Sequence, residues 1–280
     1  MINFPCAKIN LGLNIVSRRS DGYHNLETVF YPIPITDALE IKLMSKEFPS
    51  DVGCDLKISG NEVDCDEADN LVVKAYNMLS TDFSMPRVHA HLYKRIPSQA
   101  GLGGGSSDAA YMIRLLDERF RLNMGIAEME MYASKLGSDC PFFITAEQSY
   151  ATGRGEVLSP LPTEHDLLVG YYLLIVKPDV CVSTAEAFSN IVPKEPLRCC
   201  KDIVMEPVET WRNNLSNDFE TTVFAVHPSL AVIKDELYRL GAVYAQMSGS
   251  GSALFGIFRN EPMGYKKMFS KCFTYITKIE

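Results

Sequence analysis

The sequence has little positive charge for its length. Its 280 residues include 27 lysines and arginines against 35 aspartates and glutamates, which gives a formal net charge of −8. General binding to nucleic acids or membrane surfaces needs a basic footprint, so the charge argues against both roles. No apolar run approaches membrane-spanning length, and the N-terminus alternates polar and apolar residues from position 6 onward, unlike a targeting peptide. We therefore expect a cytoplasmic protein with neither a nucleic-acid nor a membrane partner.

Other common signatures are missing as well. The eight cysteines include no Cys-x-x-Cys pair, which favours buried, reduced thiols over a disulfide framework. The phosphate-binding pattern Gly-x4-Gly-Lys-Ser/Thr occurs nowhere, and the pattern Gly-x-Gly-x-x-Gly fails where Ser106 stands. These are the two common phosphate loops, so a phosphate ligand would need a third architecture.

A glycine-rich segment is the most informative feature that is present. Four of the five positions from Gly101 to Gly105 are glycine, and three consecutive glycines disfavour regular structure before a helix that Ser106 is expected to cap. Glycines bring bare N–H groups close to a ligand, and a helix start adds unpaired amides, so the segment predicts phosphate binding. The alternative is an ordinary turn in which Asp108 only complements the helix dipole. Beside a phosphate, Asp108 would need an intervening Mg²⁺ or amide.

Lys8 is a first candidate for chemistry. It shares one face of the alternating segment 6–16 with Asn10, Gly12 and Asn14. Amide side chains around one cation suit the floor of a polar pocket. An ordinary exposed strand edge is an equally good interpretation of these residues alone.

Asp139 is a second candidate. It lies in a turn between Gly137, which is expected to end a helix, and the helix-breaking Pro141. Most such aspartates only form local side-chain-to-backbone turns. If Asp139 and Lys8 converge, the carboxylate can take a proton from an alcohol, while the ammonium keeps it ionised and stabilises the developing oxyanion. Phosphoryl transfer needs little more than positioning and charge neutralisation.

The pattern of elements predicts an α+β protein, because strands and helices mix without strict alternation. Two domains are expected, at 1–157 and 158–280. The acidic stretch 45–69 matches no motif and is expected to form variable strands and loops. Strands are expected at 6–16, 39–43, 88–92, 171–176, 242–247 and 253–258, and helices at 71–79 after an Asn70 cap, at 106–120, 129–136 and 230–240, and from Pro262.

Three segments in order resemble the motifs of the galacto-, homoserine, mevalonate and phosphomevalonate kinase superfamily. They are the Lys8 strand, residues 97–110 and residues 247–253, and they span nearly the whole chain. Within the superfamily, the sequence is most similar to the 4-diphosphocytidyl-2-C-methyl-D-erythritol kinase family. The segments that carry this resemblance are 7–13, 19–24, the GGGSSDAA form of the loop, 136–143, 151–156 and 217–220.

The resemblance implies transfer of the ATP γ-phosphoryl group to the 2-hydroxyl of 4-diphosphocytidyl-2-C-methyl-D-erythritol, a step in non-mevalonate isoprenoid synthesis. By matching position, Asp139 would be the general base and Lys8 its charged partner. The substrate, a small molecule carrying cytidine diphosphate, would be held by Asn10, by Tyr23 stacking on cytosine, by His24 at its edge, by Phe188 on its other face and by Thr184 near the diphosphate.

The resemblance also implies ATP as co-substrate, and we expect Mg²⁺ as cofactor. Asp108, which would repel a phosphate without an intervening cation or amide, is the candidate linked to the metal. Asn70 and Leu71 would line the adenine site, and Lys94 would reach nucleotide phosphate or ribose. The remaining ATP contacts would come from Pro97, Gly101, Leu102, Gly103, Gly104, Gly105, Ser106 and Ser107. The implied fold pairs an N-terminal domain like the second domain of ribosomal protein S5 with a ferredoxin-like C-terminal domain, with the active site in the cleft between them. We expect a monomer or a weak homodimer.

Two alternatives remain open. Another kinase of the superfamily would act on homoserine or mevalonate, but such substrates carry no base for Tyr23 and His24 to bind. A non-catalytic nucleotide-binding sensor would have no need to retain both Lys8 and Asp139.

Overall fold

The computed structural model describes residues 1–63, 65–161 and 166–280. Their internal contacts divide the chain into two compact units. The first comprises Met1–Ala7, Pro32–Ser98 and Gly103–Glu147, and the second comprises Lys8–Tyr31, Gln99–Leu102 and Gln148–Glu280. Each unit is therefore assembled from segments that are separate in the sequence. The domain boundary at residue 157 stays a prediction.

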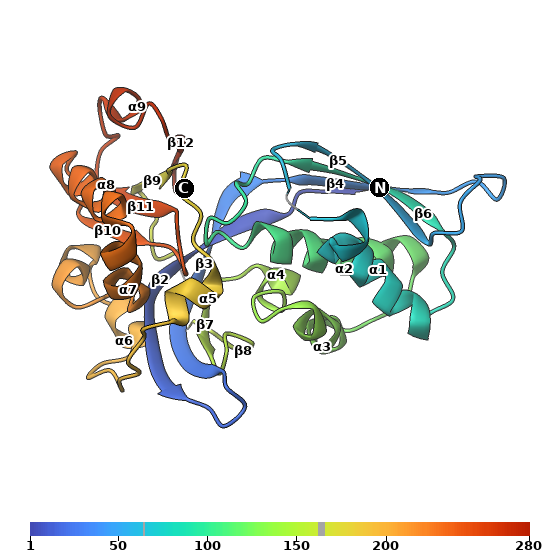
Figure 1. Cartoon of the computed structure of the whole chain (residues 1–280), viewed down its shortest axis with the longest axis horizontal. Coiled ribbons are helices and arrows are strands. Elements are labelled where there is room, and N and C mark those ends of the chain that lie inside the picture. Colours follow the sequence, from blue (N-terminus) through green and yellow to red (C-terminus); the bar gives the residue numbers. More distant parts are fainter. Residues whose placement is uncertain (64, 162–165) are drawn as a thin grey trace. The chain divides into compact units, whose positions relative to one another are not determined.

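The first unit is built on a four-stranded sheet (Figure 1). In spatial order its strands are β1 (Ile2–Asn3), β4 (Ala38–Leu43), β6 (Val88–Lys94) and β5 (Cys54–Gly60). Strands β5 and β6 are parallel, and the other neighbours are antiparallel. Alternate residues of β6, namely Val88, Ala90 and Leu92, are buried, so this strand has the apolar face that its sequence predicts.

Four α-helices lie among the described residues of the first unit. They are α1 (Leu71–Asp82), α2 (Gly104–Phe120), α3 (Ile126–Leu136) and α4 (Phe142–Thr145). Helices α1 and α2 pack against each other and against the sheet, and Figure 1 shows them along one of its sides. The Asn70 side chain accepts the Val72 N–H at 2.9 Å, which confirms the predicted cap of α1. The predicted end of α3 at Gly137 is also confirmed.

The start of α2 differs from the prediction. The helix begins at Gly104, with Gly103 as its N-cap, rather than after a cap at Ser106. Gly103 has a φ of +73°, a left-handed conformation that glycine adopts without a Cβ clash. N–H groups in a first helical turn have no partner within the helix, so two glycines are tolerated there. The expectation that the glycines lack regular structure is therefore wrong for Gly104 and Gly105.

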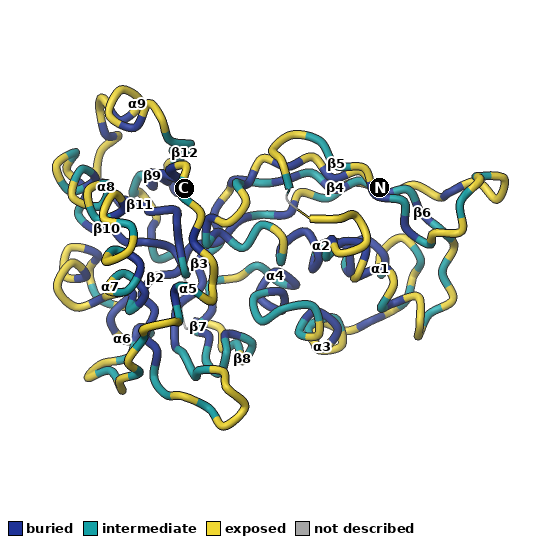
Figure 2. The backbone as a smooth tube through the Cα atoms, in the orientation of Figure 1, coloured by how far each residue is buried: buried dark blue, intermediate teal, exposed yellow. Residues whose placement is uncertain are grey.

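Most of a second sheet belongs to the second unit. Its strands are, in spatial order, β2 (Cys6–Arg18), β3 (His24–Thr36), β7 (Ser149–Thr152) and β8 (Val157–Pro160). Strands β3 and β7 are antiparallel, as are β7 and β8. The strand predicted at 6–16 is confirmed, and its far end, together with the turn into β3, is exposed in Figure 2.

The third sheet confirms the ferredoxin-like expectation. Its strands are, in spatial order, β10 (Tyr244–Met247), β11 (Leu254–Phe258), β9 (Tyr172–Lys177) and β12 (Phe273–Lys278), all antiparallel. Helices α7 (Phe219–Val226) and α8 (Pro228–Arg239) lie in the chain between β9 and β10, and α9 (Tyr265–Met268) lies between β11 and β12. This is the β-α-β-β-α-β order. The last helix begins three residues after Pro262, and β12 was not predicted.

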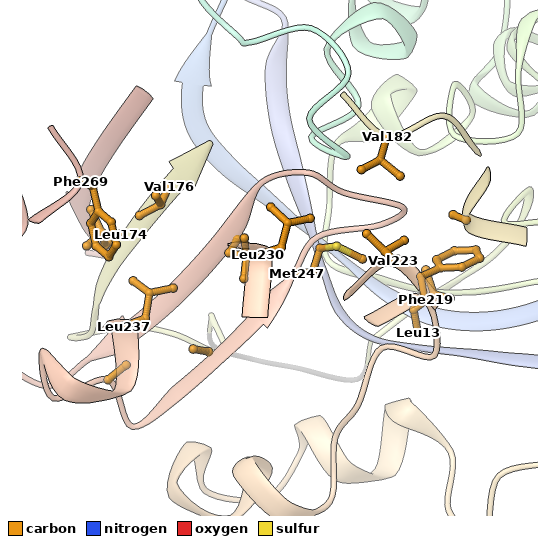
Figure 3. Close-up of a cluster of buried hydrophobic side chains, with 14 of the residues drawn as sticks. Leu13, Leu174, Val176, Val182, Phe219, Val223, Leu230, Leu237, Met247 and Phe269 are labelled. Carbon is orange, nitrogen blue, oxygen red and sulfur yellow. The ribbon is translucent and has the colours of Figure 1, made fainter. Parts of the chain in front are cut away.

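A hydrophobic cluster lies within this second unit (Figure 3). It joins Leu174 of β9 and Leu237 of α8 to Phe219 of α7. Leu13 of β2 belongs to the same cluster and is 3% exposed. Burying a leucine side chain stabilises the folded state by about 1.5–3 kcal/mol. The apolar face of the strand that carries Lys8 is therefore fixed in a core, which leaves its opposite, polar face for other partners.

The described part of the acidic stretch 45–69 contains β5 and a short 3-10 helix at Glu67–Asp69, while residue 64 lies outside the described residues. Shorter helices occur at Thr184–Phe188 (α5), Cys200–Val204 (α6) and, as a 3-10 helix, Val208–Asn213. All eight cysteines are free thiols. Within the described ranges, the helices are too short or too polar to cross a bilayer.

Candidate active site

The polar face of β2 is buried. Lys8 and Asn10 are each 2% exposed, so the exposed-edge interpretation of this face is wrong. The Lys8 ammonium donates to Asn10 Oδ1 at 2.6 Å, and Asn10 Nδ2 donates to Thr28 Oγ1 at 3.0 Å. The ammonium also lies 5.1 Å from the centre of the Phe30 ring. The strand thus holds a buried cation whose cost of desolvation is offset by hydrogen bonds and an aromatic face.

Two glycine-containing segments pack against this strand within the second unit. Ser248 Oγ donates to the Gly101 carbonyl oxygen at 2.9 Å and accepts the Asn10 N–H at 3.3 Å. The Lys8 N–H donates to the Leu102 carbonyl oxygen at 2.9 Å. Glycine is required at position 101, because its φ is +71° and a Cβ would collide with the Ser248 carbonyl oxygen. The structure therefore brings together β2, the start of the glycine-rich loop and the loop between β10 and β11.

The segment Asn217–Glu220 fixes the loop between β10 and β11. Asn217 Nδ2 donates to the carbonyl oxygens of Met247 and Gly249, at 2.8 Å each. Glu220 Oε1 accepts the Met247 N–H, also at 2.8 Å. Asn217 is 2% exposed, so these bonds are shielded from water. In the sequence, this segment stands out only through the family resemblance. An asparagine close to acidic residues carries no local signal that it holds a distant loop.

The start of α2, in the first unit, has the features of an anion site. Gly105 faces open space, because an added Cβ would meet no atom within 4 Å. The Ser107 hydroxyl is buried and has no hydrogen-bond partner among the described residues. Gly104 lies on the packed side, where a Cβ would stand 3.0 Å from Ile96 Cγ2. Unpaired amides at the positive end of a 17-residue helix favour a phosphate.

The turn that carries Asp139 lies beside the start of α2. The Cys140 N–H donates to the Gly137 carbonyl oxygen at 3.2 Å, and the Cys140 thiol shares a hydrogen bond with the Ser106 side chain. Burial raises the pKa of the Cys140 thiol to about 12, so this thiol is a packing group rather than a nucleophile. Asp139 is half-buried. Within the first unit, the candidate base and the candidate phosphate loop are therefore neighbours.

Lys94 and Asp108 belong to a buried ion cluster that the sequence analysis missed. The Lys94 ammonium donates to Asp108 Oδ2 at 2.6 Å and also to Asp37 Oδ2. Asp37 Oδ1 accepts the N–H groups of Arg95 and Ile96, at 2.6 and 2.8 Å. Burial raises the pKa of Asp108 to about 8, against the lowering effect of Lys94 and with a further rise from Asp37. Both predicted ligand contacts, of Lys94 with nucleotide and of Asp108 with a cation, stay predictions.

The residues predicted for adenine lie at the start of α1. Asn70 is 8% exposed and caps this helix. Leu71 is its first residue and is half-buried, as is Pro97 before the glycine-rich loop. Capping accounts for Asn70 without a nucleotide, so the contacts of these three residues with ATP stay predictions.

The residues predicted for the cytidine group lie in the second unit. Tyr23 is 57% exposed, and the Arg154 guanidinium lies 5.2 Å from the centre of its ring. His24 and Phe188 stack on each other, with ring centres 5.0 Å apart and planes at 17°. Thr184 is exposed at the first position of α5. The structure thus brings His24 and Phe188 together, while their contacts with a substrate, and those of Tyr23 and Thr184, stay predictions.

Comparison with known proteins gives the family. Residues 70–147 match the model of the GHMP kinases N terminal domain, and residues 205–263 match that of the GHMP kinases C terminal. A 4-diphosphocytidyl-2-C-methyl-D-erythritol kinase from Bacteroides fragilis is 50% identical over 280 residues, covering 100% of both chains. The chain belongs to the 4-diphosphocytidyl-2-C-methyl-D-erythritol kinase family. The first match contains Asp139 and the start of α2, and the second contains Asn217 and the loop that it holds.

Solved structures of kinases are similar in fold to this chain. A crystal structure of 4-(cytidine 5′-diphospho)-2C-methyl-D-erythritol kinase has a TM-score of 0.80 at 28% identity, covering 99% of this chain and 98% of that one. A homoserine kinase from Cytophaga hutchinsonii has a TM-score of 0.64 at 16% identity, covering 98% and 94%. The second likeness concerns the fold alone. The predicted two-domain fold of the superfamily is confirmed, and the fold does not by itself separate this kinase family from homoserine kinases.

Proposed function

We propose that the chain is an ATP-dependent phosphotransferase that transfers the γ-phosphoryl group to the 2-hydroxyl of 4-diphosphocytidyl-2-C-methyl-D-erythritol. One observation carries the proposal: the chain is 50% identical, over its full length, to a kinase named for that compound. The product would enter the non-mevalonate route to isoprenoids. The substrate is a small molecule, and its cytidine diphosphate group distinguishes it from homoserine and mevalonate.

In the proposed reaction, Asp139 is the general base. Its carboxylate would take the proton of the 2-hydroxyl as that oxygen attacks the γ-phosphorus, and the ADP oxygen would leave with the bonding electrons. Lys8 is the charged partner that stabilises the developing negative charge, and Asn10 orients it through their 2.6 Å hydrogen bond. The location of Asp139 beside Ser106 supports a base close to a bound phosphate.

ATP would bind with its phosphates at the start of α2. The open space at Gly105 and the unpartnered Ser107 hydroxyl support this placement. Within the described residues there is no group of three or more His, Cys, Asp or Glu side chains that could hold a metal. Asp108 Oδ2 accepts from the Lys94 ammonium, while Asp108 Oδ1 is buried without a hydrogen-bond partner among the described residues. The described residues therefore form no cage of three ligands for Mg²⁺, and the contact of Asp108 with the metal stays a prediction. The metal ion would arrive on the ATP phosphates, which are its usual ligands in kinases.

Substitution of Gly105 tests the phosphate site directly. Gly105→Ala should raise the KM for ATP about 10- to 100-fold, because the added Cβ would hold the phosphate away from the backbone N–H groups and so weaken about one charge-assisted hydrogen bond. It should not destabilise the fold, because a Cβ there meets no protein atom and alanine favours a helix over glycine. Steady-state kinetics and thermal melting would measure the two effects.

Gly125→Ala is the matched control. Gly125 precedes α3 in the same unit, and a Cβ on it also meets no atom within 4 Å. The KM of the Gly125→Ala variant for ATP should equal that of the wild type. An unchanged KM in Gly105→Ala would mean that phosphate does not approach this turn.

The proposed activity is tested by ADP release with three acceptor alcohols. 4-Diphosphocytidyl-2-C-methyl-D-erythritol should be the preferred substrate over homoserine and mevalonate at equal ATP. A preference for either competitor would make the substrate assignment wrong. Binding of ATP without ADP release on any of the three alcohols would instead support the nucleotide-binding sensor.

A further inference from the structure

Tyr23 is an exposed aromatic residue that the structure nevertheless holds in place. It is 57% exposed and is the last residue of the turn between β2 and β3. Figure 2 shows this turn as exposed chain. Its N–H donates to Asp21 Oδ1 at 3.1 Å, and its carbonyl oxygen accepts the Arg19 N–H at 2.8 Å. Arg19 and Asp21 are themselves paired at 3.0 Å. The backbone of this exposed residue is thus fixed on both sides.

The Tyr23 ring is held by Arg154, which comes from a different element. Arg154 lies in the turn between β7 and β8, and its guanidinium is 5.2 Å from the ring centre. This turn is itself fixed. The Gly153 carbonyl oxygen accepts the Leu26 N–H at 2.7 Å, and Glu156 Oε2 accepts the Arg154 N–H at 2.6 Å. The guanidinium is also 3.5 Å from Glu156 Oε1.

The arrangement prepares one face of Tyr23 for a ligand. A guanidinium against one face of an aromatic ring restricts the torsions of both side chains, so less conformational entropy is lost when a planar group stacks on the other face. An exposed aromatic side chain without such support would have to be ordered by its ligand. The neighbouring His24 is ordered too, because it stacks on Phe188. Two consecutive aromatic residues are therefore preorganised by partners distant in the sequence.

We propose that Arg154 is a positioning residue that holds the Tyr23 ring as the platform for the substrate's cytosine and so sets the affinity for cytidine nucleotides. This inference rests on the proposed function, since it needs a substrate that carries a base. Arg154 acts through Tyr23 and contributes nothing to the phosphoryl-transfer step. Its removal should therefore weaken substrate binding and leave ATP binding and kcat unchanged.

The test uses CMP as the probe in isothermal titration calorimetry, together with steady-state kinetics of the full chain. Arg154→Gln should weaken CMP binding about 3- to 30-fold, the span of cation–π contributions from exposed to desolvated pairs. The KM for the cytidylyl substrate should rise by the same factor, with the KM for ATP and kcat unchanged. Arg154→Lys should recover part of the affinity, because an ammonium still binds an aromatic face but stacks less well.

Arg212→Gln is the matched control. The Arg212 guanidinium lies over Tyr238, 4.1 Å from that ring centre, in the same unit. This variant removes an equivalent contact and the same charge, so an equal loss of CMP affinity would overturn the inference in favour of a general charge effect. An unchanged dissociation constant for CMP in Arg154→Gln would also overturn it.

A double-mutant cycle separates positioning from direct contact. In a Tyr23→Leu background, Arg154→Gln should cause no further loss of CMP affinity. A further loss of the full size would show that Arg154 contacts the nucleotide itself, and the positioning role would be wrong. Failure of the proposed function has a different signature: the wild type would neither bind CMP nor turn over the cytidylyl substrate.

Discussion

Replacing Asp139 by asparagine is expected to lower kcat by about 10²- to 10⁴-fold, the usual contribution of a general base. Asparagine preserves the size of the side chain and one acceptor oxygen, but it has no basic oxygen that can take the proton of the attacking hydroxyl. ATP binding should be retained, because the candidate phosphate site is made of backbone amides and serine hydroxyls at the start of α2. Single-turnover kinetics and calorimetric titration with ATP would measure the two properties separately.

Asp55→Asn is a suitable control for the loss of one negative charge. Asp55 pairs with His89 at 2.7 Å in the same unit, on a partly exposed surface. The kcat of the Asp55→Asn variant should equal that of the wild type. If the Asp139→Asn variant has the kcat of the wild type, Asp139 is not the general base. Joint loss of turnover and ATP binding would point instead to a disturbed turn, because the adjacent Cys140 bonds to Ser106.

The elements that could be predicted are those whose signal is local. The Asn70 cap and the apolar spacing of α1 lie within a few residues of each other, as do the stripe of α8 and Gly241, whose φ is +96°. Such patterns depend on helix geometry alone. The predicted start of α2 is too late, because glycine is penalised in a helix interior but not in the first turn, where N–H groups have no partner within the helix.

The contacts that could not be predicted join residues far apart in the chain. Asp37 is a single carboxylate without a motif, and its partners Lys94 and Asp108 are identified only when the chain is folded. The same holds for Arg154 on Tyr23. Alternation in residues 6–16 fixed which side chains share a face of β2, but alternation does not say whether the polar face meets water or protein. That face is buried because other segments with polar groups of their own cover it.

The buried ion cluster should make Lys94 one of the most sensitive positions for stability. Lys94→Met is expected to lower the free energy of unfolding by about 3–5 kcal/mol, because it strands buried carboxyls without their cation. Lys94 is 4% exposed and Asp37 1%, so water cannot replace the ammonium. The loss should grow as the pH rises. Lys94 lowers the pKa of Asp108 against the rise that burial causes, so without the ammonium this pKa rises further and the buried group needs a proton that is held less well at higher pH.

Urea unfolding at several pH values would measure this effect, with two companion variants. Lys42→Met removes an exposed partner of Glu40, 3.2 Å away with 69% of the lysine side chain exposed, and should change stability by less than about 1 kcal/mol. Adding Asp108→Asn to Lys94→Met should restore part of the stability, since one of the two stranded acids is then neutral at every pH. If Lys94→Met is instead as stable as Lys42→Met, the ammonium does not bind the two carboxyl groups in solution, and Lys94 is available for the nucleotide contact that the family resemblance implies.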